Sequence, residues 1–96
     1  STSNGTFTVG STGIYLVTGF ISYAQNTTGT RGLILTAGSN PTCEVDHAAC
    51  PNNITRVNIS KIYSLTASDV VTLLWYQTSG SSLNVTYVVF NIARIA

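Results

Sequence analysis

Residues 14–24 read IYLVTGFISYA, and this stretch decides the fold. Its side chains follow a period of two, which is the pattern of a β-strand rather than of a helix. Both faces of the strand are partly apolar, and such a strand lies between two sheets or between two subunits. One face carries Ile14, Leu16 and Phe20, and the other carries Tyr15, Val17, Ile21 and Tyr23.

The rest of the chain repeats this pattern in further segments. Clusters of Gly, Asn and Ser separate alternating segments, which predicts short strands, and no segment has a sustained helical period. The sequence therefore predicts a single all-β domain over residues 1–96, built as a sandwich. We expect strands at residues 7–9, 14–24, 32–37, 54–65, 70–78 and 83–95, and the longest irregular segment from Gly38 to Asn53.

The composition limits the classes of function. Charged residues make up 7% of the chain, against about 25% in an ordinary soluble domain. The net charge is +1 and no basic run is present, so we expect no nucleic-acid partner. The longest nearly apolar run, Val70 to Tyr76, is too short to span a bilayer, so we expect no membrane insertion.

The polar surface is supplied mainly by Ser, Thr and Asn, which suits an extracellular or virion protein. Methionine is absent, and for this reason we expect the chain to be a piece of a longer polypeptide. A domain of this size buries a modest core, and oligomerisation is one way to bury more surface.

The two cysteines, Cys43 and Cys50, lie close together in the sequence among turn-forming residues. This spacing predicts a disulfide that closes a short loop. Such a bridge would indicate an oxidising compartment or an extracellular setting. The alternative is a pair of free thiols.

Three motifs carry a resemblance to a known family. Phe7, Gly13 and Tyr15 are spaced as in the second half of the C1q-domain signature, where a glycine turn leads into a strand that opens Gly-x-Tyr. Residues 65–71, LTASDVV, resemble the Leu-x-x-Gly-Asp-x-Val hairpin of that family, with Ser68 where glycine is usual and Asp69 placed to cap the turn. The ending FNIARIA, residues 90–96, is similar to the last strand of C1q/TNF-like heads at the tips of phage fibres.

The resemblance implies a C1q/TNF-like jelly-roll sandwich of about ten antiparallel strands that assembles as a homotrimer. The chain departs from the animal pattern, since Val17 and Gly19 replace aromatic residues and the closing strand lacks Phe-x-Gly. These departures favour a microbial or viral version. We expect the trimer interface to include Tyr15, Val17, Tyr23, Trp75, Phe90 and Arg94.

The irregular segment from Gly38 to Asn53 is the predicted receptor-binding site, because functional residues concentrate on loops held by a rigid scaffold. Its hydrogen-bonding side chains suit a sugar or another polar epitope. Elsewhere in the chain, the ring of Tyr76, which we expect to be more exposed than that of Trp75, can stack on a sugar. The predicted receptor-binding residues are Glu44, Asp46, His47, Asn52 and Tyr76.

Two alternatives for this segment stay open. Because C1q-like heads can hold calcium through loop oxygens, Glu44, Asp46 and His47 are candidate metal ligands, although a solvated loop is the simpler interpretation and we expect no metal. Catalysis is not expected, because His47 is the only side chain suited to act as a base at neutral pH. For Arg31 and Arg94, binding of a ligand carboxylate competes with a structural role, which we favour.

The sequence therefore predicts a non-enzymatic, cofactor-free binding head of a phage or viral attachment fibre. It would lie on the virion surface and recognise a host-surface receptor, which we expect to be a saccharide. A purely structural module that trimerises and caps a stalk, and a secreted C1q-like lectin or ligand, are the alternatives.

Overall fold

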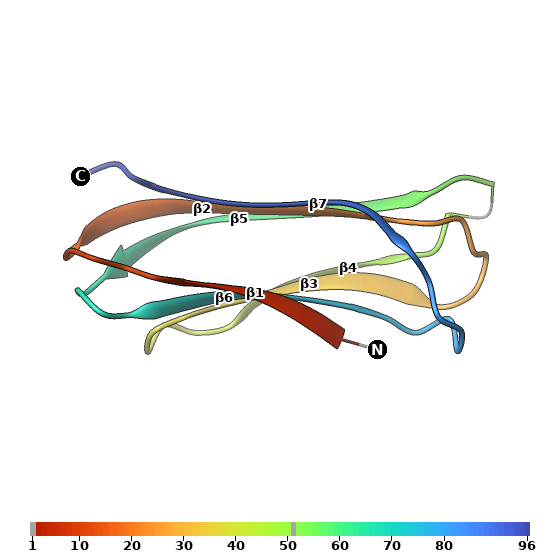
Figure 1. Ribbon diagram of the computed structural model, residues 1–96, viewed down its shortest axis with the longest axis horizontal. Helices are drawn as coiled ribbons and strands as arrows, with labels where there is room; N and C mark the ends of the chain where they lie inside the picture. The colour runs from red at the N-terminus through yellow and green to blue at the C-terminus, as the bar shows by residue number, and fades with distance from the viewer. Residues whose placement is uncertain (1, 51) are drawn as a thin grey trace.

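The computed structural model describes the backbone of residues 2–50 and 52–96 and the side chains of residues 5–50 and 52–96. The described residues form seven strands and no helix, so the predicted all-β class is confirmed. The strands form two layers, which Figure 1 shows edge-on. They are β1 (Thr2–Thr8), β2 (Gly13–Tyr23), β3 (Thr30–Ala37), β4 (Cys43–Ala48), β5 (Thr55–Leu65), β6 (Val70–Gln77) and β7 (Val85–Arg94).

One sheet has four strands in the order β1-β6-β3-β4, and the other has three strands in the order β5-β2-β7. All paired strands are antiparallel. The sandwich prediction is therefore confirmed, whereas the expected number of about ten strands is wrong for the described residues, which form seven. Strands β2 and β5 have 11 residues each and β7 has 10. Because these strands are long, fewer of them fit into a chain of this length.

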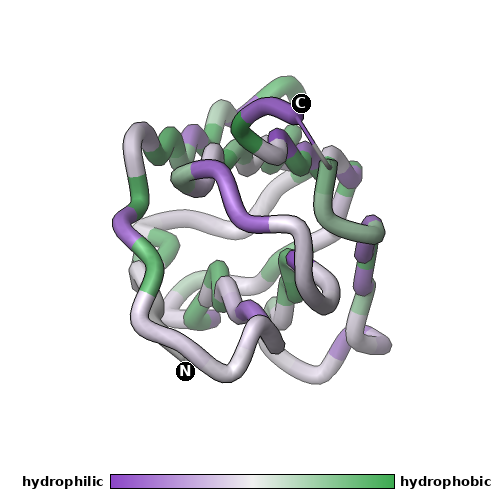
Figure 2. Tube along the Cα trace, turned by 90° about the vertical axis from the view of Figure 1, so that its right-hand side faces the viewer, coloured by the Kyte–Doolittle hydropathy of each residue, from purple (hydrophilic) through white to green (hydrophobic). Residues whose placement is uncertain are grey.

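The core lies between the two layers, because alternate side chains of each strand face the opposite sheet. In β2 the residues Tyr15, Val17, Ile21 and Tyr23 are buried against Leu33, Leu35, Leu73 and other apolar side chains of the opposite sheet. Figure 2, which looks along the strands, shows the two layers separated from each other, with loops at the near end. The predicted interface role of Tyr15, Val17 and Tyr23 is corrected by this burial: they face the second sheet of the same chain.

The turn between β5 and β6 has the cap that was expected from Asp69. Asp69 accepts a hydrogen bond from the backbone N–H of Thr66 through Oδ2 at 2.9 Å, so its side chain caps the turn. Ser68 has a φ of 78°, in the left-handed region that glycine adopts most easily. Ser68 therefore adopts a backbone conformation that favours glycine.

The predicted irregular segment from Gly38 to Asn53 is only partly irregular, and Pro51 within it lies outside the described residues. Its middle forms the edge strand β4, which pairs with β3 in the register Ile34↔Glu44 and Gly32↔Asp46. Charged residues are uncommon in strands, which made this segment resemble a loop. Edge strands use charged side chains to prevent pairing with other chains, and β4 fits that pattern.

The chain ends lie at opposite ends of the sandwich (Figure 1). The β2–β3, β4–β5 and β6–β7 loops share the end at which the described N-terminal strand begins, and the other three connections share the end with the C-terminus. Within the described part of the chain, no helix has the length and apolar character needed to cross a membrane.

Candidate functional site

A tyrosine and two carboxylates meet on the outer face of the four-stranded sheet. The hydroxyl of Tyr76, in β6, donates to Glu44 Oε2 in β4 at 2.9 Å and lies 3.3 Å from Asp46 Oδ2. Two of the three acidic residues of the chain therefore gather around one phenol. We call these three residues the tyrosine–carboxylate cluster.

Gly32 makes the cluster possible. In the register of the sheet, Gly32 of β3 lies between Tyr76 of β6 and Asp46 of β4. A Cβ atom at Gly32 would collide with Cε1 and Cζ of the Tyr76 ring. Because glycine leaves this space empty, the ring lies across β3 and its hydroxyl reaches the carboxylates on the strand beyond.

Burial and the hydrogen bond to Glu44, together with the negative charges of Glu44 and Asp46, raise the pKa of Tyr76 to about 12. The hydroxyl is therefore protonated at neutral pH and remains a hydrogen-bond donor. Both carboxylates keep further lone pairs, because an ionised carboxylate has about four acceptor sites. The cluster thus offers acceptor oxygens next to an aromatic ring, an arrangement suited to a ligand rich in hydroxyl groups.

This raised pKa predicts a loss of stability at high pH. The folded-state value of about 12 lies above the ordinary value of 10.0, so the contribution is complete below pH 10 and is lost as the pH rises towards 12. The pKa of Tyr23 is also raised to about 12, because the effect of burial exceeds the opposite effect of the positive charge of Arg31. In an ultraviolet absorbance titration of the folded protein, Tyr23, Tyr63 and Tyr76 should ionise late, and we expect Tyr76→Phe to remove one of these late-ionising groups. Ionisation of Tyr76 near pH 10 would contradict the hydrogen-bonded geometry.

The other two predicted receptor-binding residues lie elsewhere. His47 lies on the opposite face of β4 from Glu44 and Asp46, since alternate residues of a strand face opposite ways. Asn52 is exposed in the loop between β4 and β5. The structure therefore brings together Glu44, Asp46 and Tyr76 from the predicted set, and it separates them from His47 and Asn52.

The predicted disulfide is corrected by the structure, in which Cys43 and Cys50 are both free. Strand β4 begins at Cys43 and runs to Ala48. An extended segment of that length spans about 17 Å, and disulfide-bonded Cα atoms lie within roughly 7 Å of each other. The strand therefore holds the two thiols too far apart to bond.

The metal alternative has no support from the described residues, since no three His, Cys, Asp or Glu side chains among them gather closely enough to hold an ion. His47 is turned away from the two carboxylates by the strand geometry, which leaves a pair of acids where three candidate ligands were considered.

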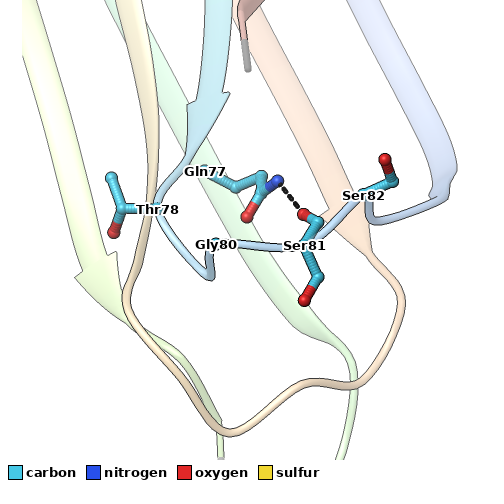
Figure 3. A pocket seen from close by; sticks show the side chains of 5 residues that line it. All are labelled: Gln77, Thr78, Gly80, Ser81 and Ser82. Carbon is cyan, nitrogen blue, oxygen red and sulfur yellow. Dashed lines mark hydrogen bonds between the residues drawn. The ribbon is translucent and has the colours of Figure 1, made fainter.

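A second polar feature lies in the β6–β7 loop, where a hollow of about 510 Å³ is lined by Gln77, Thr78, Gly80, Ser81 and Ser82. Figure 3 shows the Gln77 side chain pointing to the backbone of Ser81, and its Nε2 donates to Ser81 O at 2.6 Å. Its Oε1 accepts from the N–H of Ser79 at 2.7 Å. The amide is thus used to order its own loop, which favours a structural role for this hollow.

Comparison of the chain with protein-family models, with curated proteins and with solved structures finds no match. The resemblance to C1q/TNF-like heads therefore stays a prediction that rests on the sequence motifs.

Proposed function

We propose that this domain is the receptor-binding head of a phage or viral attachment fibre, and that it binds a host-surface saccharide through the tyrosine–carboxylate cluster. The observation that carries the proposal is the convergence of Tyr76, Glu44 and Asp46 across Gly32 on one face of the sheet. All three residues were predicted from the sequence to bind the receptor. They come from β4 and β6, which are not consecutive in the chain.

The chemistry of the cluster supports a sugar ligand. Sugar hydroxyls are donors, and the two carboxylates are strong acceptors because charge-assisted hydrogen bonds are shorter and stronger than neutral ones. An aromatic ring offers an apolar surface next to these polar groups. The ring is held by its hydrogen bond and by Gly32, so little side-chain entropy is lost when a ligand binds.

The test is binding to an array of cell-surface glycans with two matched tyrosine variants. Tyr76→Phe removes the hydroxyl that orients Glu44, whereas Tyr87→Phe removes a hydroxyl from an exposed tyrosine in the other sheet. We expect Tyr76→Phe and Glu44→Gln to weaken binding about tenfold, as loss of a charge-assisted hydrogen bond does. Tyr87→Phe should bind as the wild type does. Equal binding by all variants would contradict the proposed site.

The proposed assembly is a homotrimer that meets at the open side of the sandwich between β1 and β7. Phe7 is 46% exposed there. A hollow of about 350 Å³ on this side is lined by Thr6, Phe7, Phe90, Asn91 and Ile92. Trp75 and Phe90 are half-buried and pack against the edge of the core, so two of the predicted interface residues lie at this opening. Arg94 is exposed near the end of β7. Covering these apolar side chains is the physical reason for association.

Light scattering at micromolar concentration should give three times the chain mass of 10.1 kDa. Phe7→Asp places a charge in the proposed interface and should shift the protein towards monomer. The control is Ile62→Asp, at a residue that is 58% exposed on β5, the opposite edge strand of the other sheet, and it should leave the trimer intact. A monomeric wild type, or equal effects of the two substitutions, would contradict the proposed assembly.

A further inference from the structure

A cavity of about 340 Å³ lies at the other open side of the sandwich, along the edge strand β5 and the start of β4. It is distinct from the tyrosine–carboxylate cluster, with which it shares no residue. We call it the edge cavity. Its lining residues are Asn40, Pro41, Thr42, Cys43, Lys61, Ile62, Tyr63 and Ser64.

Tyr63, one of the residues that line the edge cavity, has a buried hydroxyl without a partner. Tyr63 is 3% exposed, and its hydroxyl oxygen is buried with no hydrogen-bond partner among the described residues. By contrast, the buried Tyr15 donates its hydroxyl to Ser11 O at 2.6 Å. The hydroxyl of a buried tyrosine normally forms a hydrogen bond, and burying the hydroxyl without one is unfavourable. Because a phenylalanine would fill the same space without this cost, the hydroxyl of this cavity-lining residue is a candidate donor to a ligand.

The groups around this hydroxyl favour an anion. Lys61 lines the cavity and none of the chain's carboxylates does. Burial, and to a smaller extent the nearby Cys43 thiol, raise the pKa of Tyr63, so its hydroxyl is available as a donor. Asn40 is already engaged, since its Nδ2 donates to Ala37 O at 3.0 Å and to Ser64 O at 3.5 Å. The residues that line the cavity therefore supply one positive charge, one donor without a partner and two apolar side chains, Pro41 and Ile62.

We propose that the edge cavity binds the carboxylate of a small, sugar-sized molecule, with the Lys61 ammonium and the Tyr63 hydroxyl as donors. The volume is at the low end of the range for small-molecule pockets, which fits a single sugar unit better than a chain of them. The two apolar side chains contact the ring carbons of the ligand. This site goes beyond the proposed receptor site and does not depend on it, because the two sites share no residue and present opposite charges.

Three probes separate the parts of this proposal when titrated into the protein and followed by backbone amide NMR shifts. Glucuronate carries both the carboxylate and the sugar ring, glucose has the ring alone, and acetate has the carboxylate alone. We expect glucuronate to shift amides of residues 40–43 and 61–64 and to bind at least tenfold more tightly than glucose. Acetate binding as tightly as glucuronate would identify a simple anion site and overturn the sugar-sized ligand. No shifts with glucuronate would overturn the proposal.

Variants assign the two donors. Lys61→Gln and Tyr63→Phe should each weaken glucuronate binding at least tenfold. Arg56→Gln is the matched control, because Arg56 is an exposed cation of the same strand that does not line the cavity, and it should bind normally. Tyr63→Phe should also keep or raise the melting temperature of the free protein, since it removes a buried hydroxyl that has no partner. A lower melting temperature with unchanged glucuronate binding would show that the hydroxyl has a purely structural role and overturn its assignment.

Discussion

Replacing Arg31 with methionine is expected to lower the free energy of unfolding by about 1–3 kcal/mol, the range for leaving buried hydrogen-bonding groups without their partner. Arg31 is 0% exposed and has no carboxylate partner among the described residues. Its Nη1 donates to Thr28 O at 2.8 Å and to Thr30 O at 3.1 Å, and its Nη2 donates to Asn26 O at 3.1 Å. The guanidinium carbon also lies 5.9 Å from the centre of the Tyr23 ring. One side chain therefore holds two carbonyl groups of the β2–β3 loop and one at the start of β3.

Methionine preserves much of the apolar volume but leaves these carbonyl groups without donors. Urea unfolding measures the loss of stability, and hydrogen exchange should show faster opening of residues 24–30. Arg56→Met is the control, since Arg56 is exposed on β5 and its replacement should change stability by less than about 0.5 kcal/mol. If Arg31→Met were as stable as this control, the structural role of Arg31 would be wrong. The preference for a structural role over ligand binding, drawn from the sequence, agrees with the contacts of this residue.

Gly32→Ala is expected to destroy the tyrosine–carboxylate cluster and to lower the stability of the domain by about 1–3 kcal/mol, the usual cost of forcing an extra group into a packed site. The added Cβ would occupy the place of the Tyr76 ring, so the ring must leave the surface of β3. Its hydroxyl then loses Glu44, and the pKa of Tyr76 should fall back towards 10.0.

Gly10→Ala is the matched control, because a Cβ at Gly10 would meet no atom within 4 Å. It should leave both the melting temperature and the late ionisation of Tyr76 unchanged. A crystal structure or absorbance titration of Gly32→Ala with Tyr76 still bonded to Glu44 would show that the glycine is not what positions the ring.

The sequence was sufficient for the strands that carry the core. In β2, β5 and β6 the alternation of apolar residues, for example Val17 and Ile21 against Val71 and Leu73, reflects burial on one face and is visible without a structure. The strand β4 was missed because carboxylates and a histidine in so short a segment are more typical of a loop than of a strand. Its role as a strand depends on pairing with β3, which is information from a distant part of the chain.

The site was predicted residue by residue but not as an arrangement. Glu44 and Asp46 were identified as hydrogen-bonding groups and Tyr76 as an exposed ring, yet their meeting depends on the register that places Gly32 between them. Gly32 itself gave no signal, since a single glycine within a strand has several possible causes. The cysteines are free for the same reason. The extended strand β4 separates Cys43 from Cys50, whereas a loop could have brought them close enough to form a disulfide.

The central claim is that a saccharide binds on the tyrosine–carboxylate cluster, and an NMR map of the bound state tests it most directly. The saccharide selected on the glycan array is titrated into isotope-labelled wild-type protein, and the shift of each backbone amide is measured. The account predicts the largest shifts in three adjacent segments of one sheet, residues 31–33, 44–46 and 75–77. Shifts confined to the end loops at residues 24–29 and 78–84, with those three segments unchanged, would contradict it.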